Sequence, residues 1–143
     1  MADPVEPSAP PPSSPPPSPT TQPTSTGLPS NIAAALASVP LIGGIIFYVL
    51  EKQDSFVRFY AMQSIIFGGA WIVINIGCAI ILGFFAVLPV IGGLLAGFWG
   101  LLWWLVNLAL FVIFVVALIK AFTGVRWEIP YIGPIARKQV GEI

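Results

Sequence analysis

Only a few side chains in this sequence are of types that could do chemistry, and they are widely spaced. Glu51 and Asp54 share a short charged stretch, and Arg58 follows Asp54 by four residues. Asn75 and Asn107 are the polar exceptions in two long apolar segments. No His is present, and we expect the two carboxylates to be solvated in a connector that faces water. A single Cys also excludes the usual zinc and haem ligand sets. We therefore expect no catalytic, cofactor or metal site and no enzyme activity.

Asn75 and Asn107 are predicted to form an interhelical polar pair. Each lies near the middle of its apolar segment, and the short turn between the segments makes the two helices antiparallel neighbours. A carboxamide in hydrocarbon needs a partner, and each asparagine offers both a donor and an acceptor. A structural clasp is favoured over a ligand contact.

The composition places the chain in a lipid bilayer. Of its 143 residues, 57% are hydrophobic and 8% are charged, whereas soluble domains carry about 25% charged residues. The net charge of zero gives no electrostatic reason to expect nucleic acid. The Gly93–Gly97 spacing allows close helix approach, which leaves intramolecular packing and homo-oligomerisation equally open. The expected partners are the bilayer and either another membrane protein or a second copy.

The apolar segments predict an all-α integral membrane protein with three transmembrane helices, over residues 31–50, 64–88 and 94–122. Residues 64–122 number 59, which is too many for one crossing and leaves no loop for three. The sequence LPVIGG separates the last two spans. Pro40 interrupts the first segment, and whether that segment is broken there or re-entrant is left open.

The predicted membrane domain, 31–122, lies between two tails. Residues 1–30 hold eleven of the fifteen prolines and ten Ser or Thr, which predicts a disordered tail; a spacer role is favoured over PxxP recognition by a partner. With three spans, all six Lys and Arg residues share one side, so the 123–143 tail is expected in the cytoplasm and the N-terminus outside the cell membrane. A two-span model with a re-entrant first segment also keeps the six together.

Residues 51–64, EKQDSFVRFYAMQS, are predicted to begin the second helix as an amphipathic stretch, capped by Asp54 or Ser55. Arg58 is spaced to pair with Asp54 in the same helix. Two roles for Arg58 are equally favoured: simple cytoplasmic anchoring, or a bidentate contact with the tail, where Glu128 lies on the same predicted side. The interface candidates in this stretch are Phe56, Arg58, Phe59, Tyr60, Gln63 and Ser64.

The stretch FVRFYAMQS, with the P-x-IG sequences at 89–92 and 130–133, resembles the Tic-twenty-like family of small membrane proteins. That family comprises a chloroplast inner-envelope import component and bacterial relatives. The resemblance covers roughly residues 31–139 and implies a translocon-like role in protein transport. The residues themselves favour a structural or interaction subunit, or an assembly factor, of a membrane complex. Transport is the alternative.

Overall fold

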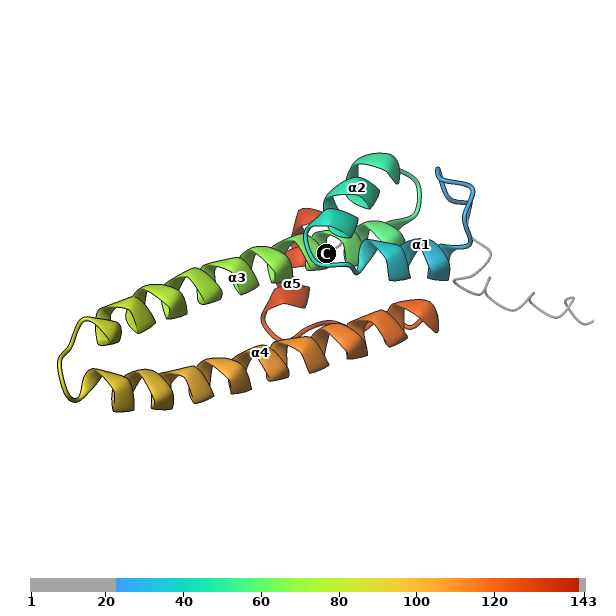
Figure 1. Ribbon diagram of the computed structural model, residues 1–143. Helices are drawn as coiled ribbons and strands as arrows, with labels where there is room; N and C mark the ends of the chain where they lie inside the picture. Colours follow the sequence, from blue (N-terminus) through green and yellow to red (C-terminus); the bar gives the residue numbers. More distant parts are fainter. Residues whose placement is uncertain (1–22, 142–143) are drawn as a thin grey trace, which may run out of the picture.

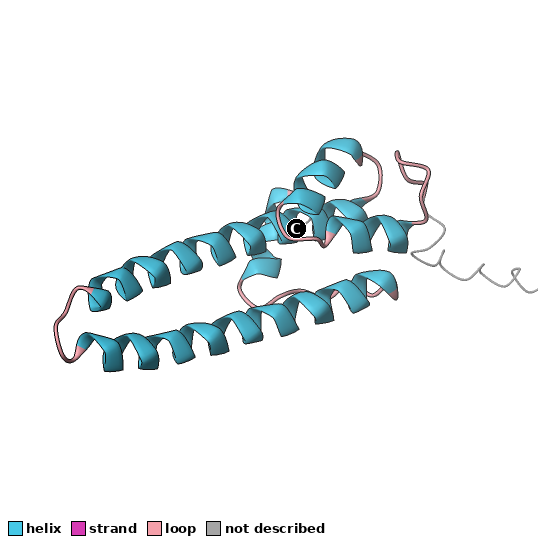
Figure 2. Cartoon of the chain, viewed as in Figure 1, coloured by secondary structure: helices cyan, strands magenta, loops and turns pink. Residues whose placement is uncertain are grey.

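A computed structural model describes residues 23–141, so most of the predicted disordered tail lies outside the described residues. The described part is all-helical, which confirms the all-α part of the predicted fold class (Figures 1 and 2). The five helices are α1 (Ser30–Ala37), α2 (Ile42–Leu50), α3 (Ser55–Ala86), α4 (Gly92–Phe122) and α5 (Ile132–Gln139).

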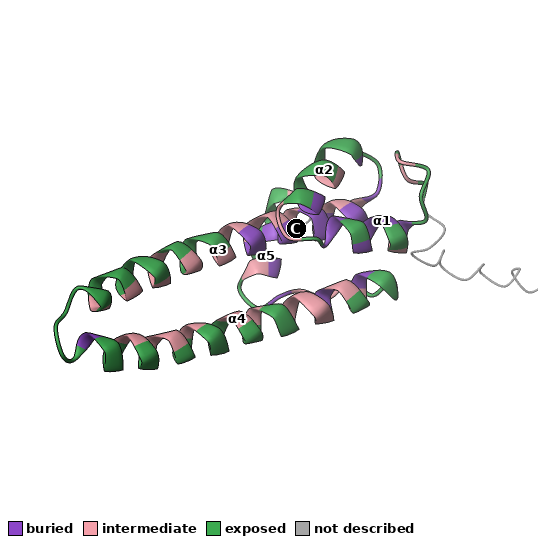
Figure 3. Cartoon of the chain, viewed as in Figure 1, coloured by how far each residue is buried: buried purple, intermediate pink, exposed green. Residues whose placement is uncertain are grey.

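Helices α3 and α4 form a long antiparallel hairpin that closes at residues 87–91 (Figure 1). Their 32 and 31 residues correspond to about 48 and 46 Å, more than the ~30 Å of a bilayer's hydrocarbon core. Only 11% and 6% of their most apolar windows are buried within the protein, and the outer part of the hairpin is mostly exposed (Figure 3). Such a large exposed apolar surface fits lipid, and these two helices are the candidate membrane spans of the described residues.

The transmembrane span predicted over residues 31–50 is not found, so three transmembrane helices are not confirmed. The segment forms two short helices, α1 and α2, with eight and nine residues, about 12 and 14 Å long. Pro40 lies between them. Helix α2 runs antiparallel to the beginning of α3: a Cβ on Gly68 would lie 2.7 Å from the Leu41 nitrogen, and one on Gly44 would lie 2.7 Å from the Ala61 carbonyl oxygen. The segment therefore turns back on itself.

The α1–α2 and α3–α4 corners have the same backbone design, with the sequence P-x-I-G at residues 40–43 and 89–92. The second residue has a positive φ, 62° at Leu41 and 69° at Val90. In both corners the isoleucine N–H donates to the proline carbonyl at 2.8 Å, which closes a three-residue γ-turn. The same turn thus reverses the chain twice.

The glycine of each corner is required by the helix that precedes it. A Cβ on Gly43 would lie 2.2 Å from the Leu36 carbonyl oxygen, and one on Gly92 would lie 2.2 Å from that of Phe85. Both contacts are far inside the van der Waals limit. Only glycine lets the second helix begin this close to the end of the first.

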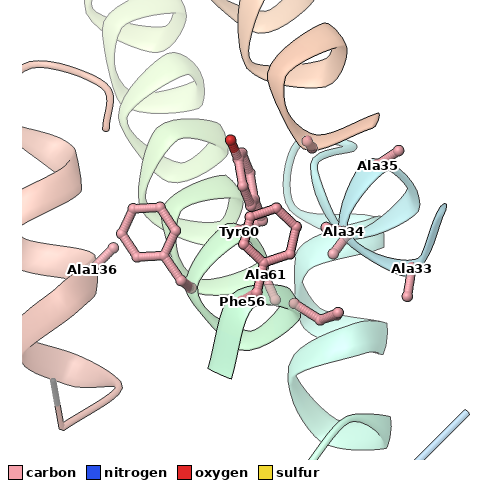
Figure 4. Packing of buried hydrophobic residues seen from close by; sticks show 11 residues of the cluster. Ala33, Ala34, Ala35, Phe56, Tyr60, Ala61 and Ala136 are labelled. Carbon is pink, nitrogen blue, oxygen red and sulfur yellow. The ribbon is translucent and has the colours of Figure 1, made fainter. Parts of the chain in front are cut away.

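The end of the hairpin away from residues 87–91 is covered by a cap, which consists of α1, α2, α5 and residues 123–131 (Figure 1). The buried hydrophobic core lies here and includes Ala33 and Ala34 of α1, Phe56 and Tyr60 of α3, and Ala136 of α5 (Figure 4). Small side chains on α1 and α5 let both helices pack closely on α3. All six Lys and Arg residues also belong to this end: Lys52, Arg58, Lys120, Arg126, Arg137 and Lys138.

Candidate functional site

The first part of α3, residues 55–68, contacts every element of the cap, and we call it the hub. Its buried residues are mostly apolar, and Tyr60, Gln63 and Ser64 supply the polar groups among them: Phe56, Val57, Phe59, Tyr60, Ala61, Gln63, Ser64, Phe67 and Gly68. As predicted, Asp54 caps the helix: its carboxylate accepts from the backbone N–H groups of Phe56 and Val57 at 2.8 and 3.4 Å. Asp54 therefore starts the hub helix at the place where three other segments contact it.

Glu51 and Asp54 are fully buried, which corrects the expectation that they are solvated. The Glu51 carboxylate accepts from the backbone N–H groups of Ser25, Gln53 and Asp54 at 2.9–3.1 Å. Asp54 also accepts a hydrogen bond from the Ser30 hydroxyl. The two carboxylates therefore fix the entry of α1 beside the loop that leaves α2.

The environment of Glu51 favours its charged form. Burial alone would raise the pKa of this carboxyl, but hydrogen bonds from the backbone of Ser25, Asp54 and Gln53 and from the Ser25 side chain hold the pKa below its ordinary value. A buried carboxylate surrounded by several N–H donors does not need a cationic partner. Its role here is to hold the backbone together.

Tyr60 and Gln63 bind an extended segment, residues 125–129, that connects α4 to α5. The Tyr60 hydroxyl donates to the Val125 carbonyl at 2.6 Å and accepts from the Trp127 N–H at 3.0 Å. The Gln63 side chain accepts from the Ile129 N–H at 3.1 Å and donates to the Trp127 carbonyl at 3.4 Å. Two side chains one turn apart thus take the place of a neighbouring β-strand and satisfy a backbone that would otherwise be unpaired.

Ser64 performs the corresponding task on the other side of the hub, at the α1–α2 corner. Its hydroxyl donates to the Val39 carbonyl at 2.7 Å, and its own carbonyl accepts from the Leu41 N–H at 3.4 Å. Non-helical backbone is tolerated at membrane depth only where protein or water satisfies its polar groups. Ser64 supplies these bonds to the corner.

The aromatic candidates Phe56 and Phe59 of the hub, together with Arg126, form a shell around these bonds. Phe56 and Phe59 both pack edge-on against Tyr60, with ring centroids 5.2 and 5.6 Å apart. The Arg126 guanidinium lies 5.0 Å from the centre of the Phe59 ring. These contacts hold the Tyr60 ring in place and hence the direction of its hydroxyl.

Arg58 does not have the carboxylate partners suggested for it. Its guanidinium lies over the Tyr48 ring of α2, 5.3 Å from the centroid. Glu128 instead accepts from Arg137 at 3.0 Å. The structure thus shows no bidentate contact between Arg58 and the tail in the described residues.

Asn75 and Asn107 lie at the interface of α3 and α4, but each is bound to a tryptophan rather than to the other asparagine. The Trp71 indole donates to Asn107 and the Trp103 indole donates to Asn75, both at 2.8 Å. Each asparagine also donates to the carbonyl of the tryptophan four residues before it, at 2.9 and 3.0 Å. The result is a closed set of four hydrogen bonds, two of which cross between α3 and α4.

The tryptophans of this set were missed from sequence, although a signal for them exists. The pattern W-x-x-x-N occurs once in each of the last two predicted spans, at residues 71–75 and 103–107. On a helix, residues four apart lie on one face. On two antiparallel helices the repeat therefore places each indole opposite the other helix's amide.

The fold and the hub define a class: a small helical membrane protein made of a two-helix hairpin with a cap at one end. The chain belongs to the magnetosome magnetite crystal formation protein family (MamF/MmsF), whose model matches residues 24–136. This range includes the whole hairpin and cap up to the middle of α5.

Similar proteins are named membrane proteins. A UPF0132 membrane protein of Methanocaldococcus jannaschii is 43% identical over 117 residues, covering 80% of this chain and 92% of the relative. A second one from that organism is 32% identical over 117 residues, covering 81% and 74%. One from Archaeoglobus fulgidus is 36% identical over 115 residues, covering 79% and 97%. No solved structure matches the chain.

Family membership corrects the resemblance inferred from sequence. The match over residues 24–136 assigns the FVRFYAMQS and P-x-IG sequences to the MamF/MmsF family and not to the Tic-twenty-like family. In this structure the FVRFYAMQS sequence forms part of the hub, and the P-x-IG sequences form chain reversals. Both therefore have a structural role in this fold. The translocon-like alternative depended on that resemblance and loses its basis with it.

Proposed function

We propose that the protein is a non-enzymatic structural or interaction subunit of a complex in the cell membrane. The observation that carries this proposal is the use of the hub: Tyr60, Gln63 and Ser64 direct their polar groups to the chain's own backbone. Such bonds make a rigid cap on a membrane hairpin. A rigid cap suits a protein that holds a surface in place for a partner.

The family description names magnetite crystal formation, and we do not extend mineral binding to this chain. The three acidic side chains of the described residues are engaged: Glu51 and Asp54 by backbone N–H groups, and Glu128 by Arg137. Carboxylates used in this way hold protein segments together. What we carry over from the family is a role embedded in a membrane.

The proposed topology has two spans and a re-entrant α1–α2 hairpin, with both described ends in the cytoplasm. Ser25 binds Glu51 and Ser30 binds Asp54, so the chain enters α1 at the level where it leaves α2. This geometry supports the re-entrant alternative over an outside N-terminus. The six basic residues then share the cytoplasmic side, as the positive-inside rule requires.

Cysteine labelling in intact cells tests the topology. In a Cys78→Ser background, single cysteines replace Leu28, Val90 or Gln139. We expect Leu28→Cys and Gln139→Cys to react only after the membrane is permeabilised, and Val90→Cys to react from outside. Reaction of Leu28→Cys together with Val90→Cys would restore the three-span arrangement.

The partner role is tested separately by native purification with crosslinking. Tyr131 is 89% exposed and Ile135 is 50% exposed on the outer face of the cap. We expect a complex larger than the 15.3 kDa chain, and its loss in Tyr131→Ser/Ile135→Ser. Val90→Asn, at the opposite end, is the control. A wild-type chain that remains alone, with no crosslinked partner or second copy, refutes the subunit role.

A further inference from the structure

The Arg58 guanidinium has an unpaired buried donor at the edge of the membrane. Its Nε is buried and has no hydrogen-bond partner within residues 23–141. A guanidinium offers five N–H donors, and leaving a buried one unpaired is costly. The contact with the Tyr48 ring orients the group but accepts none of these hydrogen bonds in the plane of the guanidinium.

The two carboxylates suggested as partners of Arg58 already accept hydrogen bonds from other groups. Asp54 accepts from Ser30 and from the first N–H groups of α3. Glu128 accepts from Arg137. The charge of Arg58 is therefore left for an anion that comes from outside the described chain.

An apolar path leads from Arg58 into the membrane. Ile65 and Ile72 follow Arg58 at intervals of seven residues, so all three lie along one side of α3. Helix α2 packs on this line at Ile65, where a Cβ on Gly44 would lie 2.9 Å from Ile65 Cγ1. The apolar path therefore runs over the outer side of α2, which exposes Ile45, Ile46 and Val49. The path ends in an open groove of about 340 Å³ lined by Pro40, Leu41, Gly68, Trp71, Ile72 and Asn75.

The length of this path matches one leaflet. Arg58 and Ile72 are fourteen residues apart, about 21 Å along α3. Half of a bilayer with its headgroups is about 20–22 Å. When the guanidinium is at the level of the phosphates, the groove is therefore at the bilayer centre, where acyl chains end.

We propose that this side of α3 is a phospholipid-binding site, in which Arg58 binds the phosphate and an acyl chain follows α2 into the groove at Ile72. The guanidinium fork matches two phosphate oxygens, and Lys would match them less well. The groove exists because the α1–α2 hairpin turns back at Pro40 and leaves the deeper part of α3 uncovered.

Native mass spectrometry of the full chain tests the site. The protein is extracted from vesicles that contain equal amounts of dioleoylphosphatidylglycerol and dioleoylglycerol, which differ by the phosphate-bearing headgroup. We expect wild type to retain the phospholipid at least about tenfold better, and Arg58→Gln to lose this preference. Arg58→Lys should retain part of it. Arg137→Gln, the same change of type and charge at the same end, should leave it unchanged.

Two further arms separate the parts of the site. Ile72→Trp fills the groove without changing the charge, and should lower the retention of both lipids. Inorganic phosphate at millimolar concentration should not displace the phospholipid, because free phosphate has no chain to hold. Equal losses in Arg58→Gln and Arg137→Gln, or full displacement by inorganic phosphate, would overturn the proposal. So would equal retention of the two lipids by wild type, and circular dichroism checks that each variant is folded.

Discussion

Replacing Trp103 by Phe and Asn75 by Leu removes the two ends of one interhelical hydrogen bond while keeping apolar volume in the hairpin. The bond is 2.8 Å long and lies between α3 and α4, and Trp71 with Asn107 forms its counterpart. Each single change leaves a polar group unpaired, at a cost of about 1–3 kcal/mol. The double change removes both groups at once.

The size of the expected coupling follows from the bond lying between two membrane helices. Hydrogen bonds between membrane helices contribute about 0.6 kcal/mol on average, with a maximum near 1.7 kcal/mol. We expect a coupling free energy in this range for Trp103→Phe with Asn75→Leu, and likewise for Trp71→Phe with Asn107→Leu. The free energy of unfolding is measured in mixed micelles by circular dichroism during SDS titration.

The swapped pairs provide the control. Asn75 donates to the backbone carbonyl of Trp71, which phenylalanine retains, so Trp71→Phe with Asn75→Leu should be additive within about 0.3–0.5 kcal/mol. The same holds for Trp103→Phe with Asn107→Leu. Coupling in the swapped pairs as large as in the matched pairs would refute the reciprocal arrangement. Strong coupling between the two asparagines alone would mean that the amides bind each other.

Three further predictions follow from the corners, the hub and the buried carboxylate. Gly43→Ala and Gly92→Ala should each lower the free energy of unfolding by about 1–3 kcal/mol, because the added Cβ meets a carbonyl oxygen. Gly69→Ala is the control, since a Cβ there has open space. Equal effects of all three substitutions would contradict this explanation. Tyr60→Phe should speed amide exchange in residues 125–129, which loses two hydrogen bonds, and unchanged exchange there would argue against the clamp. The depressed pKa of Glu51 stabilises the fold above the ordinary carboxyl pKa, and this stabilisation is lost as pH falls through the lower folded-state value. Wild type should therefore lose more stability than Glu51→Gln as pH is lowered below about 4, and parallel pH profiles would count against it.

Local chemistry predicted much of the helical framework but not the long-range contacts of the hub. Neighbouring residues are enough to predict the Asp54 N-cap of α3 and the turn of the hairpin. They also indicate the importance of residues 51–64. The burial of Glu51 does not, because its donors include Ser25, twenty-six residues away. Tyr60 and Gln63 likewise bind a segment more than sixty residues later, and no pattern near them indicates which segment it is.

The first apolar segment is different, because its reversal was readable from the sequence. Residues 36–44 read LASVPLIGG and residues 85–93 read FAVLPVIGG. The second of these predicts a turn. For the first, the twenty-residue length of the apolar segment suits a crossing and leaves a break or a re-entrant segment open at Pro40. The length of an apolar segment is the weaker criterion for a crossing, because it counts apolar residues and takes no account of turn residues within the segment.

The repeated sequence carries a stronger physical requirement. A positive φ at the residue after proline, and a glycine that a Cβ would drive into the preceding helix, are specific to a chain that reverses at once. The third P-x-I-G sequence, at residues 130–133, supports this: Tyr131 has φ 68°, and a Cβ on Gly133 would lie 2.4 Å from the Cβ of Glu128. Three occurrences of one sequence thus begin α2, α4 and α5, each directly after a sharp change of chain direction. In this chain, P-x-I-G is better evidence for a reversal than twenty apolar residues are for a crossing.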